Sequence, residues 1–157
     1  MVDVLDINRI RVGVKVETKE EVLKLVSEIA FKDEIVKSKE EYFNGLLARE
    51  EECTTGFGKG FAIPHCKSST VNKASVIVLK LDNEVEWESM DDKPVNFVLA
   101  LAVPDTEAGT THLKILSKIA RFLMDDEFTM KLESSKSEEE IRVMLRPAAL
   151  AAFTISC

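Results

Sequence analysis

Histidine, cysteine and long apolar runs are all scarce in this chain. Only two of its 157 residues are histidines, His65 and His112, and only three are cysteines. The cysteines are odd in number and show no CxxC spacing, which argues against a disulfide framework and against a zinc knuckle. We therefore expect reduced thiols, and the two histidines become the main candidates for chemistry.

No apolar run is long enough to cross a membrane. The longest, Val95 to Val103, is interrupted by Asn96, whereas a spanning helix needs about 20 apolar residues. The N-terminus also lacks the apolar core of a secretory signal. We expect a cytoplasmic protein.

Basic residues are outnumbered by acidic ones, 21 to 28, which gives a net charge of -7. Sequence-independent binding of nucleic acid depends on basic residues that neutralise phosphates, so we expect no nucleic-acid partner. A basic protein partner suits this charge better. The composition, 45% apolar and 31% charged, is typical of a globular protein, and the length fits one domain.

Helix signals occur in five places. The first helix, from Thr18 to about Lys32, begins with the spacing of a capping box. The second begins at Ser38 with the same signature and ends near Glu51. A third helix, capped by Thr110 or Thr111, is predicted from an apolar stripe that runs from Leu113 to Leu123. Two shorter helices are predicted around Asp126 to Leu132 and, from another capping box, over Ser137 to Leu145.

Two kinds of extended segment alternate with these helices. Val12, Val14 and Val16 alternate with other residues, which predicts a first strand with one buried face. Two segments are apolar at both alternations, as in strands covered on both faces: Ala74 to Leu81 and Val95 to Val103. The pattern predicts a single-domain α/β sandwich in which helices flank a mixed central β-sheet.

Shorter features lie between these elements. Val85 and Trp87 alternate with glutamates, which predicts a short strand with one wet face. Cys53 to Gly60 is rich in glycine and threonine and is predicted to be a loop. Phe61 to Ile63 should return to extended backbone, because a residue before proline is pushed away from the helical region.

The end of the chain has an apolar composition without clear periodicity. Pro147 is expected to stop the last helix. We therefore divide the chain into a domain of residues 1–146 and a C-terminal tail of residues 147–157 whose role is unknown.

His65 follows a glycine-rich loop and a rigid Ile-Pro step. Pro64 fixes one backbone torsion, and the loop glycines allow close approach to neighbouring backbone. With an ordinary pKa of about 6.5, most imidazole is neutral at pH 7 and leaves one ring nitrogen free to attack phosphorus. We interpret His65 as a phosphohistidine site; the alternative is a structural histidine bonded to a backbone carbonyl.

His112 is expected in the first turn of its helix. Unpaired backbone amides and the helix dipole create partial positive charge there, which attracts anions and disfavours an imidazolium. A neutral His112 could donate a hydrogen bond to a phosphoryl oxygen. The alternative is a partly exposed histidine at a helix start.

Arg49, Thr54 and Thr55 are candidate groups for holding a phosphoryl group. The planar guanidinium of Arg49 can donate to two phosphoryl oxygens and balance their charge. Thr54 and Thr55, in the loop before the glycines, could donate hydroxyls to the same group. The alternatives are an arginine that only complements the helix dipole and threonines that only cap turns.

Two other site types fit the sequence poorly. The loop glycines lack the preceding strand and following helix of a dinucleotide fingerprint. Cys66 beside His65, with His112 as a third ligand, would suggest a metal, but no HExxH spacing or paired carboxylate supports it. We expect neither a metal nor another cofactor.

Several segments together resemble a known family. They are Arg49-Glu50, the run TTGFGKGFAIPH from Thr54 to His65, THL from Thr111 to Leu113 and LMDDEF from Leu123 to Phe128. With these, residues from about Val12 to Leu145 resemble the IIA domain of the phosphoenolpyruvate-dependent sugar phosphotransferase system. The match is to the fructose/mannitol type, which includes the related nitrogen-regulatory IIA proteins.

The resemblance implies a phosphocarrier of a bacterial sugar uptake system. His65 matches the histidine that accepts phosphate from the basic carrier HPr and passes it to a cysteine of a IIB domain. His112 matches the second active-site histidine, and Arg49 matches an arginine that stabilises the phosphoryl group. A membrane IIC transporter would be an indirect partner, the implied fold is a mixed sheet flanked by helices, and no cofactor is implied.

A purely regulatory protein is the main rival to this interpretation. In it, phosphorylation of His65 would switch the binding of a kinase, transporter or transcription factor, with no sugar route. The segment from Val71 to Trp87 and the LMDDEF stretch look closer to the fructose-type domains, which favours transport.

Overall fold

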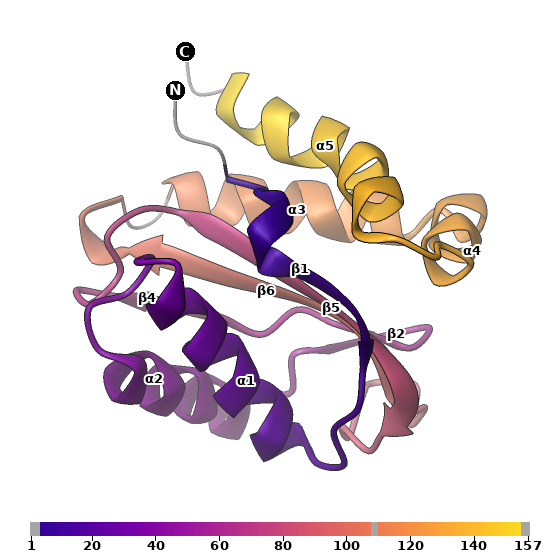
Figure 1. The fold of residues 1–157 in the computed structure, drawn as a ribbon, viewed down its shortest axis with the longest axis horizontal. Helices are drawn as coiled ribbons and strands as arrows, with labels where there is room; N and C mark the ends of the chain where they lie inside the picture. The colour runs from indigo at the N-terminus through magenta and orange to yellow at the C-terminus, as the bar shows by residue number, and fades with distance from the viewer. Residues whose placement is uncertain (1–3, 108–109, 155–157) are drawn as a thin grey trace.

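Helices cover both faces of one mixed β-sheet (Figure 1). The computed structural model describes the backbone of residues 4–107 and 110–154, and the side chains of residues 4–106 and 114–147. Helices α1 and α2 lie on one face of the sheet, and α3, α4 and α5 lie on the other. This arrangement confirms the predicted α/β sandwich.

The described sheet has six strands in the order β1-β5-β6-β3-β2, with β4 paired to β6 as well. The pairs β1–β5, β3–β6 and β4–β6 are parallel, whereas β5–β6 and β2–β3 are antiparallel. The strands are β1 Ile10–Val14, β2 Gly56–Gly58, β3 Phe61–Ala62, β4 His65–Ser68, β5 Ser75–Val85 and β6 Val95–Pro104. The two apolar segments therefore are central strands, as predicted.

Five α-helices occur in the described backbone, close to their predicted positions. Thr18 and Ser38 cap the first two, since their side chains accept hydrogen bonds from the amides of Glu21 and Glu41. The helices are α1 Lys19–Lys32, α2 Lys39–Glu52, α3 Thr110–Leu123, α4 Asp126–Glu133 and α5 Glu138–Thr154, with short 3-10 turns at Ile7–Arg9 and Asp105–Glu107. Within the described ranges, no helix combines the length and apolarity needed to cross a bilayer.

Each face of the sheet has its own hydrophobic core. On the α1 and α2 side, Tyr42, Ile77 and Trp87 are fully buried. On the other side, Leu99 and Ile141 are fully buried among residues of the remaining helices. Strand β6 contributes to both cores along nearly its whole length, which explains why it is apolar at both alternations.

The first strand differs from its prediction because of a bulge. Strand β1 ends at Val14, and its register against β5 shifts between Arg11 and Val14. Gly13 lies in this interval with a φ of +67°, a conformation that glycine adopts readily. The bulge places Val12 against one core and Val14 against the other, so the predicted single buried face was wrong.

Three other local predictions were wrong. Val85 ends the long strand β5 instead of starting a short one, and Trp87 lies in the following loop with its side chain fully buried. The predicted loop from Cys53 to Gly60 contains strand β2. Helix α5 continues to Thr154 with Pro147 inside it; a proline removes one backbone donor, and the remaining residues keep helical geometry.

Candidate functional site

His65 is the first residue of β4 and is anchored directly to the central strand. It lies opposite Leu101 of β6, and the Pro64 carbonyl accepts a hydrogen bond from the Leu101 amide at 2.8 Å. Only 8% of His65 is exposed. The backbone that carries the imidazole is therefore held by the sheet, as the Ile-Pro step predicts.

Helix α2 is fixed against the same point of β6. The Tyr42 hydroxyl donates to the Leu101 carbonyl at 2.9 Å. Burial raises the pKa of Tyr42 well above its ordinary value, so the hydroxyl remains protonated and able to donate. This bond ties α2, the helix that also carries Arg49, to the residue that pairs with His65.

The two ring nitrogens of His65 have different partners. Nδ1 lies 2.8 Å from the Ile63 carbonyl oxygen, and Arg49 Nε donates to Nε2 at 3.2 Å. A carbonyl can only accept and a guanidinium can only donate. These partners define the neutral tautomer with hydrogen on Nδ1 and a lone pair on Nε2.

The surroundings of His65 favour its neutral form. Burial lowers its pKa below the ordinary 6.5, and the positive charge of Arg49 lowers it further. The Ile63 carbonyl and the Glu50 carboxylate act in the opposite direction without reversing the shift. The imidazole is therefore an uncharged base with its lone pair on Nε2.

Arg49 links the end of α2 to the imidazole. Its Nη1 donates to the Cys53 carbonyl at 2.8 Å, at the C-cap of the helix. Arg49 therefore complements the helix dipole, which was the alternative role, and also contacts His65. Arg49 is half-buried, and its hydrogen bond holds the cation close to Nε2.

Thr54 and Thr55 lie beside Trp87 and direct their hydroxyls to protein acceptors. The Thr54 hydroxyl donates to the Trp87 carbonyl at 3.3 Å. The Thr55 hydroxyl donates to Glu50 and accepts from Trp87 Nε1 at 3.3 Å. Each hydroxyl would have to leave its present acceptor before it could donate to a phosphoryl oxygen. Phosphoryl binding by Thr54 and Thr55 therefore stays a prediction.

Glu50 is a buried carboxylate that the sequence analysis did not select. Its side chain is 5% exposed and pairs with Lys19 of α1 at 3.2 Å. It also accepts hydrogen bonds from the amide and hydroxyl of Thr55. Its place directly after Arg49 in the RE pair was the signal that could have identified it.

The second histidine falls only partly within the described structure. Helix α3 begins at Thr110, which places His112 in its first turn, as predicted. The side chain of His112 lies outside the described residues. Its proximity to His65 therefore stays a prediction.

Cys66, the residue after His65, is buried. Burial raises the pKa of its thiol to about 11, so it remains protonated near neutral pH. Its Sγ packs on α2, where a Cβ added to Gly45 would overlap it. Among the residues with described positions, no group of three or more His, Cys, Asp or Glu could hold a metal ion.

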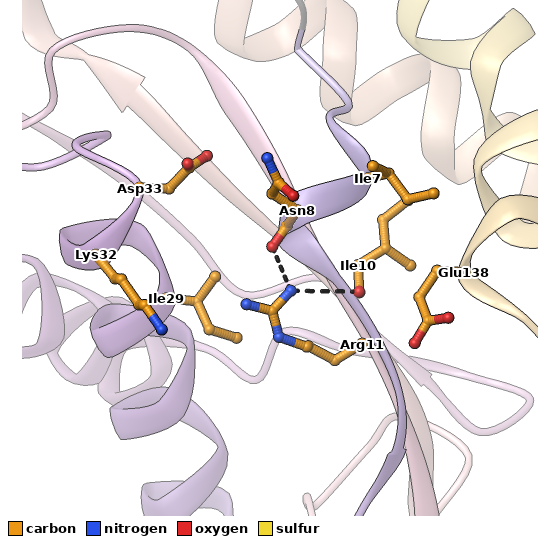
Figure 2. A pocket seen from close by; sticks show the side chains of 8 residues that line it. All are labelled: Ile7, Asn8, Ile10, Arg11, Ile29, Lys32, Asp33 and Glu138. Atoms are coloured by element: carbon orange, nitrogen blue, oxygen red, sulfur yellow. Dashed lines mark hydrogen bonds between the residues drawn. The ribbon is translucent and has the colours of Figure 1, made fainter.

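A hollow of about 490 Å³ lies elsewhere, between β1, the end of α1 and the start of α5 (Figure 2). Arg11 donates there to the backbone carbonyls of Asn8 and Ile10. The lining residues are Ile7, Asn8, Ile10, Arg11, Ile29, Lys32, Asp33 and Glu138. None of them is a candidate site residue, and we assign this hollow no part in the chemistry.

The fold and site define an α/β protein with a neutral histidine held between a backbone carbonyl and an arginine. Residues 3–147 match the family described as phosphoenolpyruvate-dependent sugar phosphotransferase system, EIIA 2. The chain therefore belongs to this family, which confirms the resemblance seen in its motifs.

Some relatives of the chain are named nitrogen regulatory proteins, and others are named components of PTS systems. A nitrogen regulatory protein of Bradyrhizobium diazoefficiens is 41% identical over 111 residues, covering 70% of this chain and 72% of that protein. A PTS system fructose-specific EIIA component of Haloferax volcanii is 33% identical over 128 residues, covering 82% of each. In the 2-O-alpha-mannosyl-D-glycerate-specific EIIABC component of Escherichia coli, the match covers only 16% of the protein.

Solved structures share the fold. Nitrogen regulatory protein IIA-Ntr from Neisseria meningitidis superposes with a TM-score of 0.85 at 30% identity, covering 90% of this chain and 96% of that one. A complex of IIAMTL with phosphorylated IIBMTL from Escherichia coli matches with a TM-score of 0.75 at 24% identity, covering 89% and 95%. The second likeness shows the fold alone.

Proposed function

We propose that this protein is a phosphocarrier that accepts a phosphoryl group from phospho-HPr on His65 and passes it to a cysteine of a IIB domain. The observation that carries the proposal is the neutral His65, whose Nε2 lone pair faces Arg49 while Nδ1 donates to Ile63. The family membership and the fructose-specific relative support this direction of transfer. The protein would act in the cytoplasm, with a membrane IIC transporter as an indirect partner.

The proposed step exchanges one nitrogen–phosphorus bond for another. Nε2 of His65 attacks phosphorus in line with the leaving nitrogen of phospho-HPr, whose electron pair returns to the HPr imidazole. Little covalent work is required of the protein beyond alignment and charge compensation. In the second step, a IIB thiolate attacks the same phosphorus and the electron pair returns to Nε2.

Arg49 must change partners during this step. Its Nε–H occupies the Nε2 lone pair before transfer, and that lone pair forms the new bond to phosphorus. The guanidinium can then donate to the phosphoryl oxygens, with which it makes stronger, charge-assisted hydrogen bonds. We propose that His112 donates to the same group from the start of α3.

The proposal is tested by incubating the protein with phosphoenolpyruvate, Enzyme I and HPr. We expect one acid-labile phosphate per chain, no labelling of His65→Ala, and labelling but impaired onward transfer for His112→Ala. Normal labelling of folded His65→Ala would refute the assignment.

A regulatory role is the second candidate, and the higher identity to a nitrogen regulatory protein favours it. Its chemistry at His65 would be the same, but phosphorylation would control the binding of another protein. Mixing the phosphorylated chain with IIB domains separates the two roles. Transfer to a IIB cysteine supports the sugar route, whereas a stable phosphoprotein that no IIB domain discharges supports regulation.

A further inference from the structure

A line of hydrogen bonds begins at Glu50, the residue that follows Arg49 in α2. The Oε1 atom of Glu50 accepts from Lys19 Nζ at 3.2 Å and from the Thr55 amide at 3.1 Å. The Oε2 atom accepts from the Thr55 hydroxyl. This carboxylate therefore binds α1 and the loop after α2 at the same time.

The line continues through the backbones of two residues, Thr55 and Ile63, to the imidazole. The Thr55 carbonyl accepts from the Ile63 amide at 2.9 Å. The Ile63 carbonyl in turn lies 2.8 Å from Nδ1 of His65. The bonds fix the backbones of Thr55 and Ile63 against the carboxylate, and so hold the Ile63 carbonyl where it can accept a hydrogen bond from Nδ1.

We propose that Glu50 is a positioning residue: it holds the backbones of Thr55 and Ile63 in place, so that the Ile63 carbonyl keeps His65 in the tautomer whose lone pair is on Nε2. This inference deepens the proposed function and rests on it for its effect on phosphoryl transfer. The effect on the imidazole itself exists in the resting protein and can be measured there.

Glutamate suits this position better than glutamine, which is an amide, or aspartate, which has a shorter side chain. Three donors converge on Glu50, and an ionised carboxylate accepts from all three without presenting a donor. Glutamine has nearly the same shape but turns one oxygen into a donor and removes the charge that balances Lys19. Aspartate keeps the charge but shortens the side chain by one methylene and draws the acceptor away from Thr55.

The experiment compares Glu50→Gln and Glu50→Asp with wild type by 15N NMR of histidine-labelled protein at a pH where His65 is neutral. In wild type we expect the Nδ1–H tautomer. In both variants we expect a detectable share of the Nε2–H tautomer. Glu51→Gln, an exposed change of the same charge on the same helix, is the matched control and should resemble wild type.

Transfer kinetics from phospho-HPr supply the second readout. We expect the maximal rate to fall by about 10-fold or more in both Glu50 variants, as for lost orienting contacts elsewhere, with little change in the KM for phospho-HPr. Loss of the Glu50 charge should also lower the pKa of His65 further in the glutamine variant, but not in the aspartate variant.

An unchanged tautomer in both folded variants would overturn the inference, even if transfer slowed. A wild-type protein that showed the Nε2–H tautomer would also overturn it, without the need for any variant. If wild type accepted no phosphate at all, the proposed function would fail, while the tautomer measurement would still decide whether Glu50 orients the ring.

Discussion

At the scale of single residues, the two hydrogen bonds of His65 determine which nitrogen can react. Nδ1 is occupied by its bond to the Ile63 carbonyl, and Nε2 holds the lone pair beside Arg49. Burial keeps the ring uncharged, because an imidazolium would lose more hydration than a neutral ring. An exposed imidazole would be protonated in mild acid. The buried His65 keeps its Nε2 lone pair available at a lower pH.

The lowered pKa of His65 predicts how stability depends on pH. Between the folded pKa and about 6.5, the unfolded chain binds a proton that the folded imidazole does not, so the free energy of unfolding rises with pH in that window. The contribution is complete above about pH 6.5 and is lost as the pH falls through the folded pKa.

Urea unfolding of wild type and His65→Gln at a series of pH values checks this prediction. The difference between their unfolding free energies should change in favour of wild type as the pH rises through the window. An NMR titration that gave His65 a pKa above 6.5 would contradict it.

At the scale of elements, the site lies where α2, the loop after it and β4 meet the central strand. Tyr42 fixes α2 to the carbonyl of Leu101, and Leu101 pairs with His65. The elements that carry Arg49 and His65 therefore both contact one residue of β6. The close packing of α2 on β4 also depends on Gly45, which leaves room for the Cys66 sulfur.

The effect of Gly45→Ala on the free energy of unfolding should therefore depend on which residue occupies position 66. In wild type the added Cβ overlaps Cys66 Sγ, and we expect overpacking of about 1–3 kcal/mol to exceed the helical gain of alanine. In a Cys66→Ala background the nearest atom is the Cβ of residue 66 at 3.6 Å, so the same change should stabilise by up to about 1 kcal/mol. Urea unfolding of the four variants measures both effects, and equal destabilisation in both backgrounds would contradict the packing argument.

Most elements could be predicted from local sequence, and so could the candidate residues His65 and Arg49, which the structure brings into contact. Capping boxes identified the starts of α1 and α2, and the Ile-Pro step indicated a fixed His65. The bulge at Gly13 could not be predicted, because a two-residue period gives no sign of a register shift. Glu50 was missed because no spacing rule relates its three donors. One is on Lys19 of α1, and the other two are the amide and hydroxyl of Thr55 in the loop after α2.

At the scale of the molecule, one central strand connects the site to both cores. Strand β6 pairs with β5 on one side and with β3 and β4 on the other. The Ile63 carbonyl and the His65 ring lie at the junction of β3 and β4, both of which run parallel to β6. The backbone that carries the imidazole is therefore part of the main sheet.

Removal of the residues after Arg146 tests whether the last part of α5 belongs to this unit. Among the described side chains of α5, Ile141 and Leu145 are buried, whereas Arg146 and Pro147 are exposed. We expect the free energy of unfolding of the shortened chain to lie within about 1 kcal/mol of the wild-type value, because the last buried side chain described in α5, Leu145, is retained and exposed positions such as Pro147 contribute little to stability. We also expect its phosphorylation rate to stay the same; unfolding or loss of phosphorylation would contradict the predicted boundary between residues 1–146 and 147–157.

The most direct test of the central claim is to locate the phosphate on the imidazole by NMR. With only two histidines in the chain, long-range 1H–15N spectra of the protein phosphorylated by phosphoenolpyruvate, Enzyme I and HPr can identify both the residue and the ring nitrogen. The account predicts phosphate on Nε2 of His65 with hydrogen retained on Nδ1. Phosphate on Nδ1, on His112 or on no histidine would contradict it.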